Sequence, residues 1–240
     1  MQVTVTKPEP RRRRRRPKPV DLPRAFSREL KPARLIIHRS TPKAVYQFQT
    51  RKTKGPVACE SWSELRTYRR FEVDNNVVTF NVQPVTILYE LDGYQHEYTP
   101  DAAVRYADRR EEFVEVKPKR IAETERFKRH EEARRATFEA EGYPYVVLTE
   151  DYFAKQPEAK NAEELLYYGQ PEPDPILAYW VTELITDHSP RTLGELEALM
   201  DPDPELRWKL YAMAIRGVFT IDISRPLSAD SLITSHQQSA

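Results

Sequence analysis

A series of short segments with alternating apolar and polar residues runs from Val77 to Lys117, and this pattern restricts the fold more than any other feature. The segments span residues 77–82, 85–91, 94–98, 102–106 and 113–117. A period of two is typical of β-strands, and the Asp92-Gly93 pair is a frequent hairpin turn. We therefore expect a largely antiparallel sheet in the middle of the chain.

Helical patterns lie on both sides of these strands. Residues 61–64, Ser-Trp-Ser-Glu, form a capping box that opens one helix, and a short hairpin over residues 44–60 precedes it. Residues 119–141 are rich in Glu, Arg and Ala and end at Gly142, which predicts a second helix. The apolar run over residues 145–149 is typical of a buried strand. The expected fold class is therefore α/β, with helices packed on a sheet as an α/β sandwich.

The C-terminal part of the sequence predicts a smaller helical unit after a proline-rich boundary. Helix starts are indicated by Asp174-Pro175, by a capping box at residues 192–195 and by Asp203-Pro204, and residues 219–223 alternate like a strand. Short helices followed by a hairpin are the layout of a winged helix. The expected units are a basic arm over 1–40, an α/β domain over 41–156, a linker over 157–173, a winged-helix-like domain over 174–225 and a tail over 226–240.

Charge is distributed unevenly along the chain. Residues 1–40 contain 13 Lys/Arg and 3 Asp/Glu, a net charge of +10, whereas residues 41–240 contain 25 and 34, a net charge of −9. Prolines and like-charge repulsion oppose helix formation, so residues 1 to about 32 are expected to be extended and mostly disordered. Consecutive arginines attract phosphate and predict contact with nucleic acid, although a solvated tail without a specific role is the alternative. The run consists of Arg11, Arg12, Arg13, Arg14, Arg15 and Arg16.

Composition excludes several classes of protein. No stretch approaches the roughly 20 apolar residues that span a membrane, and the basic N-terminus is not followed by the apolar segment of a secretory signal. Cys59 is the single cysteine, which excludes an internal disulfide and a cysteine-based zinc site. We expect a soluble protein of the cytoplasm.

Acidic residues and a lysine occur at the ends of two predicted strands. Asp101 begins one strand, and Glu115 and Lys117 lie two residues apart on the next, so they project from the same face. If the turn near Asp108 makes these strands neighbours, Asp101 can approach Glu115. The two carboxylates and the Val116 carbonyl would then offer oxygen ligands to Mg²⁺. Lys117 could orient or deprotonate a metal-activated water, as phosphodiester hydrolysis requires.

Glu64, on the helix before the strands, could reach this metal or its water from the side. Glu60 competes for that role, but Ser61 and Ser63 suggest that Glu60 precedes the helix. An isolated Glu-x-Lys on a strand is commonly a solvated charge pair. The hypothesis of a nuclease therefore depends on the whole set of residues.

These residues resemble the active-site motif of the PD-(D/E)xK restriction-type nucleases. The resemblance is carried by residues 98–101, Tyr-Thr-Pro-Asp, and 114–118, Val-Glu-Val-Lys-Pro, and it is closest to the TnsA-type endonuclease subunits of heteromeric transposases. Residues 52–55, 59–61 and Gln83-Pro84 are also similar to that family. The resemblance covers roughly residues 40–225 and implies a restriction-endonuclease-like α/β sandwich followed by a winged-helix domain.

The resemblance also implies an activity and partners. It implies an Mg²⁺-dependent DNA endonuclease, with Mn²⁺ as a substitute, that cuts the 5′ ends of a transposon. A DDE transposase, TnsB, would process the 3′ ends, and an AAA+ regulator, TnsC, would link excision to target choice. Glu64, Asp101, Glu115 and the Val116 carbonyl would bind metal, and Lys117 would be the catalytic lysine. Some members have Gln in place of Glu115, and the glutamate offers the fuller metal site.

Alternatives stay open for the interactions and the role of the protein. Lys119 and Arg120 could line the DNA path, but interleaved glutamates make a salt-bridged surface equally plausible. Residues 157–240 contain 6 Lys/Arg and 14 Asp/Glu, which opposes DNA binding and favours a protein partner, the AAA+ regulator. The chain could also be a stand-alone restriction or repair nuclease, or a non-catalytic DNA-binding adaptor. The intact carboxylates and lysine favour an enzyme.

Overall fold

The computed structural model describes residues 22–27, 30, 32–33 and 45–235, and the arginine run lies outside them. The helices are η1 (Leu22–Phe26), α1 (Trp62–Val73), α2 (Lys119–Ala122), α3 (Glu125–Ala140), α4 (Glu150–Phe153), α5 (Glu158–Tyr168), α6 (Pro175–His188), α7 (Leu193–Ala198) and α8 (Leu206–Ala214). The strands are β1 (Tyr46–Phe48), β2 (Val57–Cys59), β3 (Val77–Val82), β4 (Ile87–Leu91), β5 (Tyr94–Tyr98), β6 (Ala102–Tyr106), β7 (Glu111–Val116), β8 (Tyr145–Leu148), β9 (Phe219–Ile221) and β10 (Ile233–Ser235). Within the described ranges, no helix combines the length and the apolar character of a membrane span.

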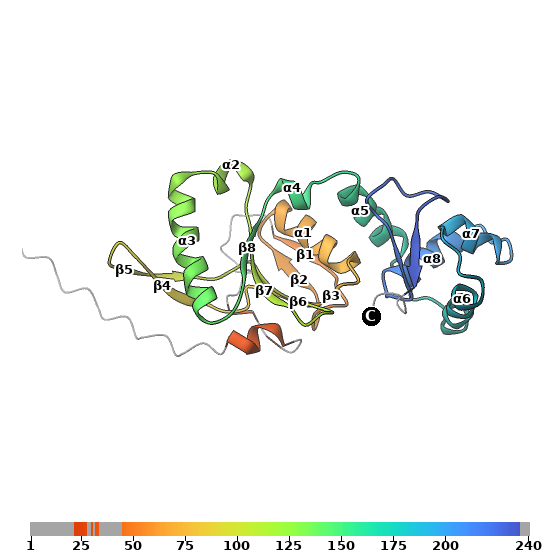
Figure 1. Ribbon diagram of the computed structural model, residues 1–240, viewed down its shortest axis with the longest axis horizontal. Helices are drawn as coiled ribbons and strands as arrows, with labels where there is room; N and C mark the ends of the chain where they lie inside the picture. Colours follow the sequence, from red (N-terminus) through yellow and green to blue (C-terminus); the bar gives the residue numbers. More distant parts are fainter. Residues whose placement is uncertain (1–21, 28–29, 31, 34–44, 236–240) are drawn as a thin grey trace, which may run out of the picture.

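The central sheet has strands in the order β3-β6-β7-β8. β6 pairs antiparallel with β3 and β7, whereas β8 runs parallel to β7 because α2 and α3 carry the chain back to the same end. β4 and β5 form a separate hairpin that projects from the sheet beside α3 (Figure 1). The expected mixed α/β architecture is confirmed, and β3, β5 and β6 have the predicted bounds.

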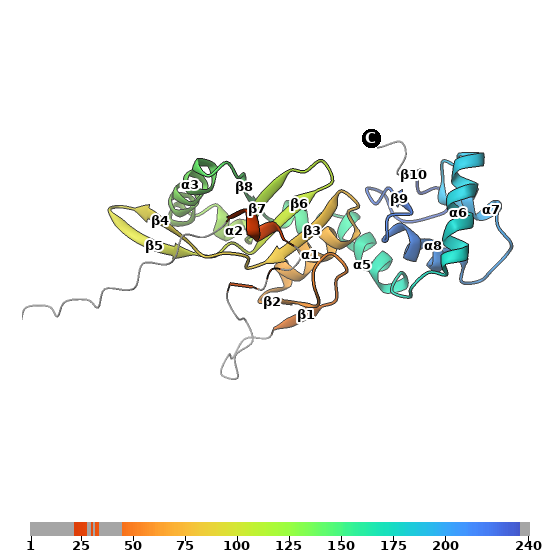
Figure 2. The ribbon, with the colours of Figure 1, turned by 90° about the horizontal axis from the view of Figure 1, so that it is seen from below.

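The sheet is covered on both faces, as its alternating residues require. Ala102 and Val104 of β6 and Val114 of β7 belong to a core shared with α1. Ala103 and Phe113 belong to a second core, shared with α3 and the β4–β5 hairpin. Figure 2 shows α1 and α3 on opposite sides of the sheet. Successive side chains of a strand therefore pack into the cores on opposite faces of the sheet.

The segment before the first hairpin is not extended, because residues 22–26 form the 3-10 helix η1 on the sheet. Ala25 and Phe26 are fully buried, and the centroids of the Phe26 and Phe113 rings lie 5.1 Å apart. The side-chain amide of Asn81 donates a hydrogen bond to the carbonyl of Ala25 at 2.8 Å. The prediction of an extended arm is wrong over this range, because its apolar residues find partners far along the chain.

Other element boundaries also differ from the predicted ones. The helix expected over residues 119–141 is divided into α2 and α3, because the Thr124 hydroxyl caps α3 by accepting a hydrogen bond from the Phe127 N–H at 3.3 Å. β7 begins at Glu111, two residues before the predicted start at residue 113, and therefore includes Glu112. The expected tail supplies β10, which pairs antiparallel with β9.

The C-terminal region contains α6, α7, α8 and the two-stranded sheet β9–β10. Asp174 caps α6 and Thr192 caps α7, as the sequence predicts, and Val181 and Leu193 are among the core residues. The region is helical as expected, whereas its assignment to a winged helix and the domain boundaries stay predictions. The expected linker over residues 157–173 contains α5, which packs on both α1 and α8.

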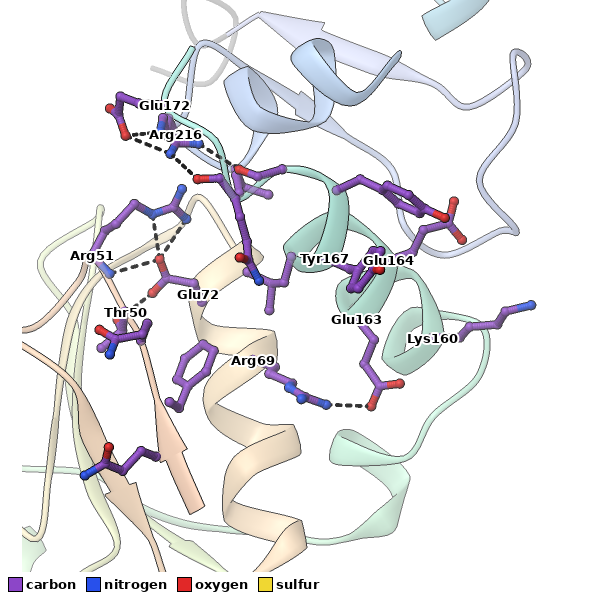
Figure 3. Close-up of a pocket in the computed structure, with 18 residues that line it drawn as sticks. Thr50, Arg51, Arg69, Glu72, Lys160, Glu163, Glu164, Tyr167, Glu172 and Arg216 are labelled. Carbon is purple, nitrogen blue, oxygen red and sulfur yellow. Dashed lines mark hydrogen bonds and ion pairs between the residues drawn. The ribbon is translucent and has the colours of Figure 1, made fainter. Parts of the chain in front are cut away.

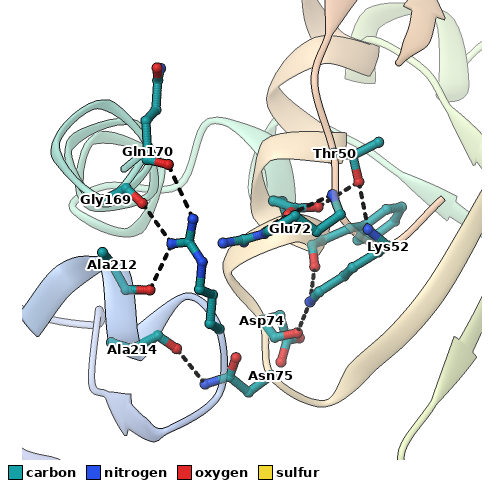
Figure 4. A network of polar contacts seen from close by, with 12 residues as sticks. Thr50, Lys52, Glu72, Asp74, Asn75, Gly169, Gln170, Ala212 and Ala214 are labelled. Carbon is teal, nitrogen blue, oxygen red and sulfur yellow. Dashed lines mark hydrogen bonds and ion pairs between the residues drawn. The ribbon is translucent and has the colours of Figure 1, made fainter. Parts of the chain in front are cut away.

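Polar contacts join the end of α1 to the C-terminal region. The side-chain amide of Asn75 donates to the carbonyls of Ala214 and Phe219 at 3.1 and 3.3 Å, and the first of these bonds is drawn in Figure 4. The Arg216 guanidinium donates to the carbonyl of Gly169, at the end of α5, at 2.9 Å, and α5 in turn packs on α1. The position of α1 is therefore fixed from the C-terminal side as well as by the sheet.

A cavity of about 920 Å³ lies at this junction, between β1, α1, α5 and the segment after α8 (Figure 3). Ion pairs line it, among them Arg51 with Glu72 at 2.7 Å, Arg69 with Glu163 at 3.0 Å and Arg216 with Glu172 at 2.8 Å. None of the sequence-predicted catalytic residues is part of its lining. The cavity therefore belongs to the junction and not to the candidate site.

Cys59, the last residue of β2, is fully buried in the core that includes α1. Burial, together with the negative charge of Glu64, raises the pKa of its thiol to about 12. Because the thiolate is the reactive form, we expect native Cys59 to resist a disulfide reagent at about pH 8 and to react in denaturant. A thiol titration with and without urea measures this. Equal labelling rates in both conditions would contradict the burial of this residue.

Candidate active site

The antiparallel pairing of β6 with β7 brings the predicted acidic residues to one end of the sheet. Ala102 lies opposite Val114, so Asp101 and Glu115 are the next residues along the two strands. The Asp101 carboxylate accepts a hydrogen bond from the Val116 N–H at 2.8 Å. The two strands are neighbours, which is the condition that the sequence hypothesis required.

The main chain of Asp101 is held from two sides. Its carbonyl accepts a hydrogen bond from the Gln83 N–H at 3.0 Å and another from the Tyr68 hydroxyl at 3.0 Å. Gln83 follows β3 and has a φ of 44°, which is uncommon for a residue other than glycine. Tyr68 lies on α1. The end of β3 and α1 therefore both position the aspartate.

Glu115 and Lys117 form an ion pair, as expected for strand residues two apart. Lys117 Nζ lies 2.6 Å from Glu115 Oε1, and the side chains are 33% and 4% exposed, respectively. The carboxylate is thus interior, whereas the lysine side chain is partly exposed. The other carboxylate oxygen, Oε2, accepts a hydrogen bond from the Tyr98 hydroxyl.

Glu64 lies in the first turn of α1, and Glu60 precedes the helix, as the serines suggested. The Ser61 hydroxyl donates to Glu64 Oε1 at 2.8 Å, and the Glu60 N–H donates to Oε2 at 2.9 Å. The capping box therefore engages both oxygens of the Glu64 carboxylate.

Burial and the repulsion of nearby carboxylates disfavour the anionic forms of Asp101 and Glu64. The pKa of Asp101 is raised well above its ordinary value, by burial first and then by the charge of Glu115. Burial also raises the pKa of Glu64. Burial alone would lower the pKa of Lys117, but the carboxylates of Glu115 and Asp101 raise it above its ordinary value. This balance keeps Lys117 charged and favours an additional cation beside the carboxylates.

Carboxylate oxygens are hard donors that suit Mg²⁺, and Asp101 and Glu115 supply them. Among the described residues, no group of three or more His, Cys, Asp or Glu side chains is arranged to hold a metal ion. Glu64 is engaged by its own helix cap instead. Because Mg²⁺ is commonly held by one or two carboxylates together with water and substrate phosphate, the pair of Asp101 and Glu115 fits this ion.

The sequence assigned no role to three side chains around Glu115, although Tyr98 belongs to the motif that carries the resemblance. The hydroxyls of Tyr98 and Tyr145 lie 3.0 Å apart, and the Arg134 guanidinium carbon lies 4.1 Å from the centroid of the Tyr98 ring. Burial and the charge of Glu115 raise the pKa of Tyr98 well above its ordinary value, so its hydroxyl keeps its hydrogen. A tyrosine in a strand is typical of a core residue, and the hydrogen bond from Tyr98 to Glu115 can be recognised only once the strands are placed in the fold.

The basic residues after β7 have different environments. Lys119 Nζ pairs with Asp151 at 2.9 Å, and the Lys119 N–H donates to a carboxylate oxygen of Glu150 at 2.6 Å. Arg120 is exposed on α2. Lys119 thus takes part in a salt-bridged surface, and DNA contact by Lys119 and Arg120 stays a prediction.

Comparison with known proteins identifies the part of the chain that contains most of this site. Residues 74–150 match a protein-family model described as TnsA-like endonuclease N terminal. No curated protein is significantly similar to the chain. The match includes Asp101, Glu115 and Lys117, whereas Glu64 precedes it. Residues 74–150 are therefore a TnsA-like endonuclease N-terminal domain, which implies a nuclease.

Proposed function

We propose that this chain is a divalent-metal-dependent DNA endonuclease that cuts the 5′ ends of a transposon within a heteromeric transposase. The pairing of β6 with β7 carries the proposal, because it gathers Asp101, Glu115 and Lys117 inside residues 74–150. Buried carboxylates beside a lysine provide the charges that phosphodiester hydrolysis needs.

In this proposal, Asp101, Glu115 and the Val116 carbonyl hold Mg²⁺ or Mn²⁺, and Glu64, whose oxygens are engaged by its helix cap, contributes negative charge from α1. When bound, the ion would neutralise developing negative charge on the phosphate and lower the pKa of a coordinated water. The raised pKa of Asp101 supports a cation at this position, because a cation relieves the repulsion between the carboxylates.

Lys117 stays an ammonium group between the carboxylates, because their charges raise its pKa. We infer that it orients the attacking water and stabilises negative charge rather than removing a proton. The exposed fraction of its side chain, 33%, leaves it accessible from the solvent side of the site.

The other functions of a transposase would come from partners. A DDE transposase, TnsB, would process the 3′ ends, and an AAA+ regulator, TnsC, would connect excision with target choice. The acidic composition of residues 157–240 supports a protein partner for the C-terminal region, because negative charge opposes approach to phosphate. The run over residues 11–16 would bind transposon-end DNA.

The proposal is tested by a cleavage assay with the full chain, DNA that carries both transposon ends, and the partner DDE transposase. We expect cuts in the 5′ strands that require Mg²⁺ or Mn²⁺ and stop when EDTA removes the ion. Cutting of unrelated duplex by the chain alone would support a stand-alone nuclease instead. DNA binding without cleavage in any of these mixtures would support a non-catalytic adaptor.

A further inference from the structure

A pair of buried phenols lies behind the Glu115 carboxylate. Tyr98 of β5 is 8% exposed and Tyr145 of β8 is fully buried. The Tyr98 hydroxyl contacts Glu115 Oε2 and also lies 3.0 Å from the Tyr145 hydroxyl. Residues from three strands therefore form a chain of hydrogen bonds that ends at one carboxylate oxygen of Glu115.

The hydrogen bonds in this pair have a defined direction. A phenol has one hydrogen to donate, and an ionised carboxylate can only accept. Tyr98 therefore donates to Glu115, and Tyr145 donates to the oxygen of Tyr98. Both donations point toward Glu115 and hold its Oε2 on the interior side of the site.

The ring of Tyr98 has little freedom to move. The Arg134 guanidinium carbon lies 4.1 Å from its centroid, and the centroids of Tyr145 and Phe138 lie 6.0 and 6.4 Å away. A cation over one face and aromatic edges nearby fix the plane of the ring. The hydroxyl of Tyr98 is thus a rigid donor rather than a mobile one.

We propose that Tyr98 is a positioning residue that holds Glu115 Oε2 in the interior, so that Glu115 offers only Oε1 to a divalent cation. The proposal rests on the proposed function and concerns the choice of the cation. Oε1 is the oxygen that lies 2.6 Å from Nζ of Lys117, whose side chain is 33% exposed.

A carboxylate that can offer only one of its two oxygens discriminates between divalent ions of different coordination. Mg²⁺ requires octahedral coordination with short bonds and Mn²⁺ also suits octahedral oxygen sites, whereas Ca²⁺ takes more oxygens and commonly binds both oxygens of one carboxylate. A Glu115 that is held by Tyr98 therefore favours the smaller ions. Without this hydrogen bond the carboxylate could rotate and bind Ca²⁺ through both oxygens.

The experiment measures the affinities of the full chain for Mn²⁺ and Ca²⁺ by calorimetry, for wild type, Tyr98→Phe, Tyr145→Phe and Tyr106→Phe. We expect Tyr98→Phe to bind Mn²⁺ about 10- to 100-fold more weakly, since outer hydrogen-bond partners of metal ligands have effects of this size. Ca²⁺ affinity should be retained or increased. Tyr145→Phe should shift the ratio of the two affinities in the same direction by a smaller factor.

Tyr106→Phe is the matched control, because Tyr106 donates its hydroxyl hydrogen to Glu112, a carboxylate on β7 outside the candidate site. It should leave both affinities unchanged. Thermal unfolding of each variant separates a loss of structure from a change in the site. Equal losses of Mn²⁺ and Ca²⁺ binding in Tyr98→Phe, or no change in either, would overturn the proposal.

If Tyr98→Phe does not fold, Tyr145→Phe decides the question, and an unchanged ratio of affinities in that variant would reject the positioning role. A wild-type chain that does not bind Mn²⁺ would refute the proposed function itself. Metal binding by wild type with no effect of either tyrosine would refute only the role of Tyr98.

Discussion

Asp101→Ala is expected to abolish cleavage of the 5′ strand, with a loss of rate of about 10²–10³-fold or more, because a buried group that stabilises charge at the reacting centre is removed. The fold should survive, since Gln83 and Tyr68 bind the main-chain carbonyl of Asp101, which the substitution keeps. The assay uses end-labelled transposon-end DNA with the partner transposase present. Wild-type cutting by this variant would show that the active site lies elsewhere.

Lys117→Ala and Glu115→Gln distinguish the chemical step from metal occupancy within the same assay. Glu115→Gln keeps an amide oxygen that can bind Mg²⁺ but loses one negative charge, so its defect should be partly recovered by more Mg²⁺. Lys117→Ala should not recover, because its defect lies in the chemistry. Glu112→Gln, on the same strand but bonded to Tyr106, serves as the control and should cut normally. Rescue of Lys117→Ala but not of Glu115→Gln would reverse the assigned roles.

Phe26→Ala is expected to cause a large loss of stability, about 3–5 kcal/mol, because it empties a fully buried site between packed aromatic rings. The Phe26 ring contacts Phe113 and Tyr143, with centroids 5.1 and 5.3 Å away. Urea unfolding followed by fluorescence measures the change in the free energy of unfolding. The control is Tyr94→Ala, since Tyr94 is 68% exposed at the hairpin turn and should contribute little.

Truncation is a second test of whether η1 stabilises the core. Removing residues 1–20 leaves η1 intact and should not change the unfolding midpoint, whereas removing residues 1–27 deletes η1 and should lower it. Equal midpoints for the two truncations would show that η1 does not contribute to the core.

Local signals predicted the elements that depend on nearby residues. Alternation gave the bounds of β3, β5 and β6, and the hydroxyls of Ser61 and Thr192 cap α1 and α7 as expected. The contact of Asp101 with the end of β7 was also predictable, because a short turn between two strands makes them neighbours and sets their register.

Features that depend on distant residues were not predictable in the same way. Phe26 lies among prolines and arginines in the sequence, and its partners follow far along the chain. Tyr98 has the pattern of a core residue, and only the arrangement of β5 and β7 gives it a carboxylate partner. The capping box at residues 61–64 was predicted, and its bonds to both carboxylate oxygens of Glu64 compete with a role for this side chain at a metal ion.

Helix α1 has one end at the candidate site and the other at the C-terminal region. Glu64 lies in its first turn, and Asn75, just after its end, bonds to the carbonyl of Ala214. Its 12 residues span about 18 Å at 1.5 Å per residue. One inserted residue would lengthen it by about 1.5 Å and rotate everything beyond it by about 100°. The length of α1 therefore fixes the spacing between the candidate site and the C-terminal region, and insertions should be tolerated at the Gly93 turn but not within this helix.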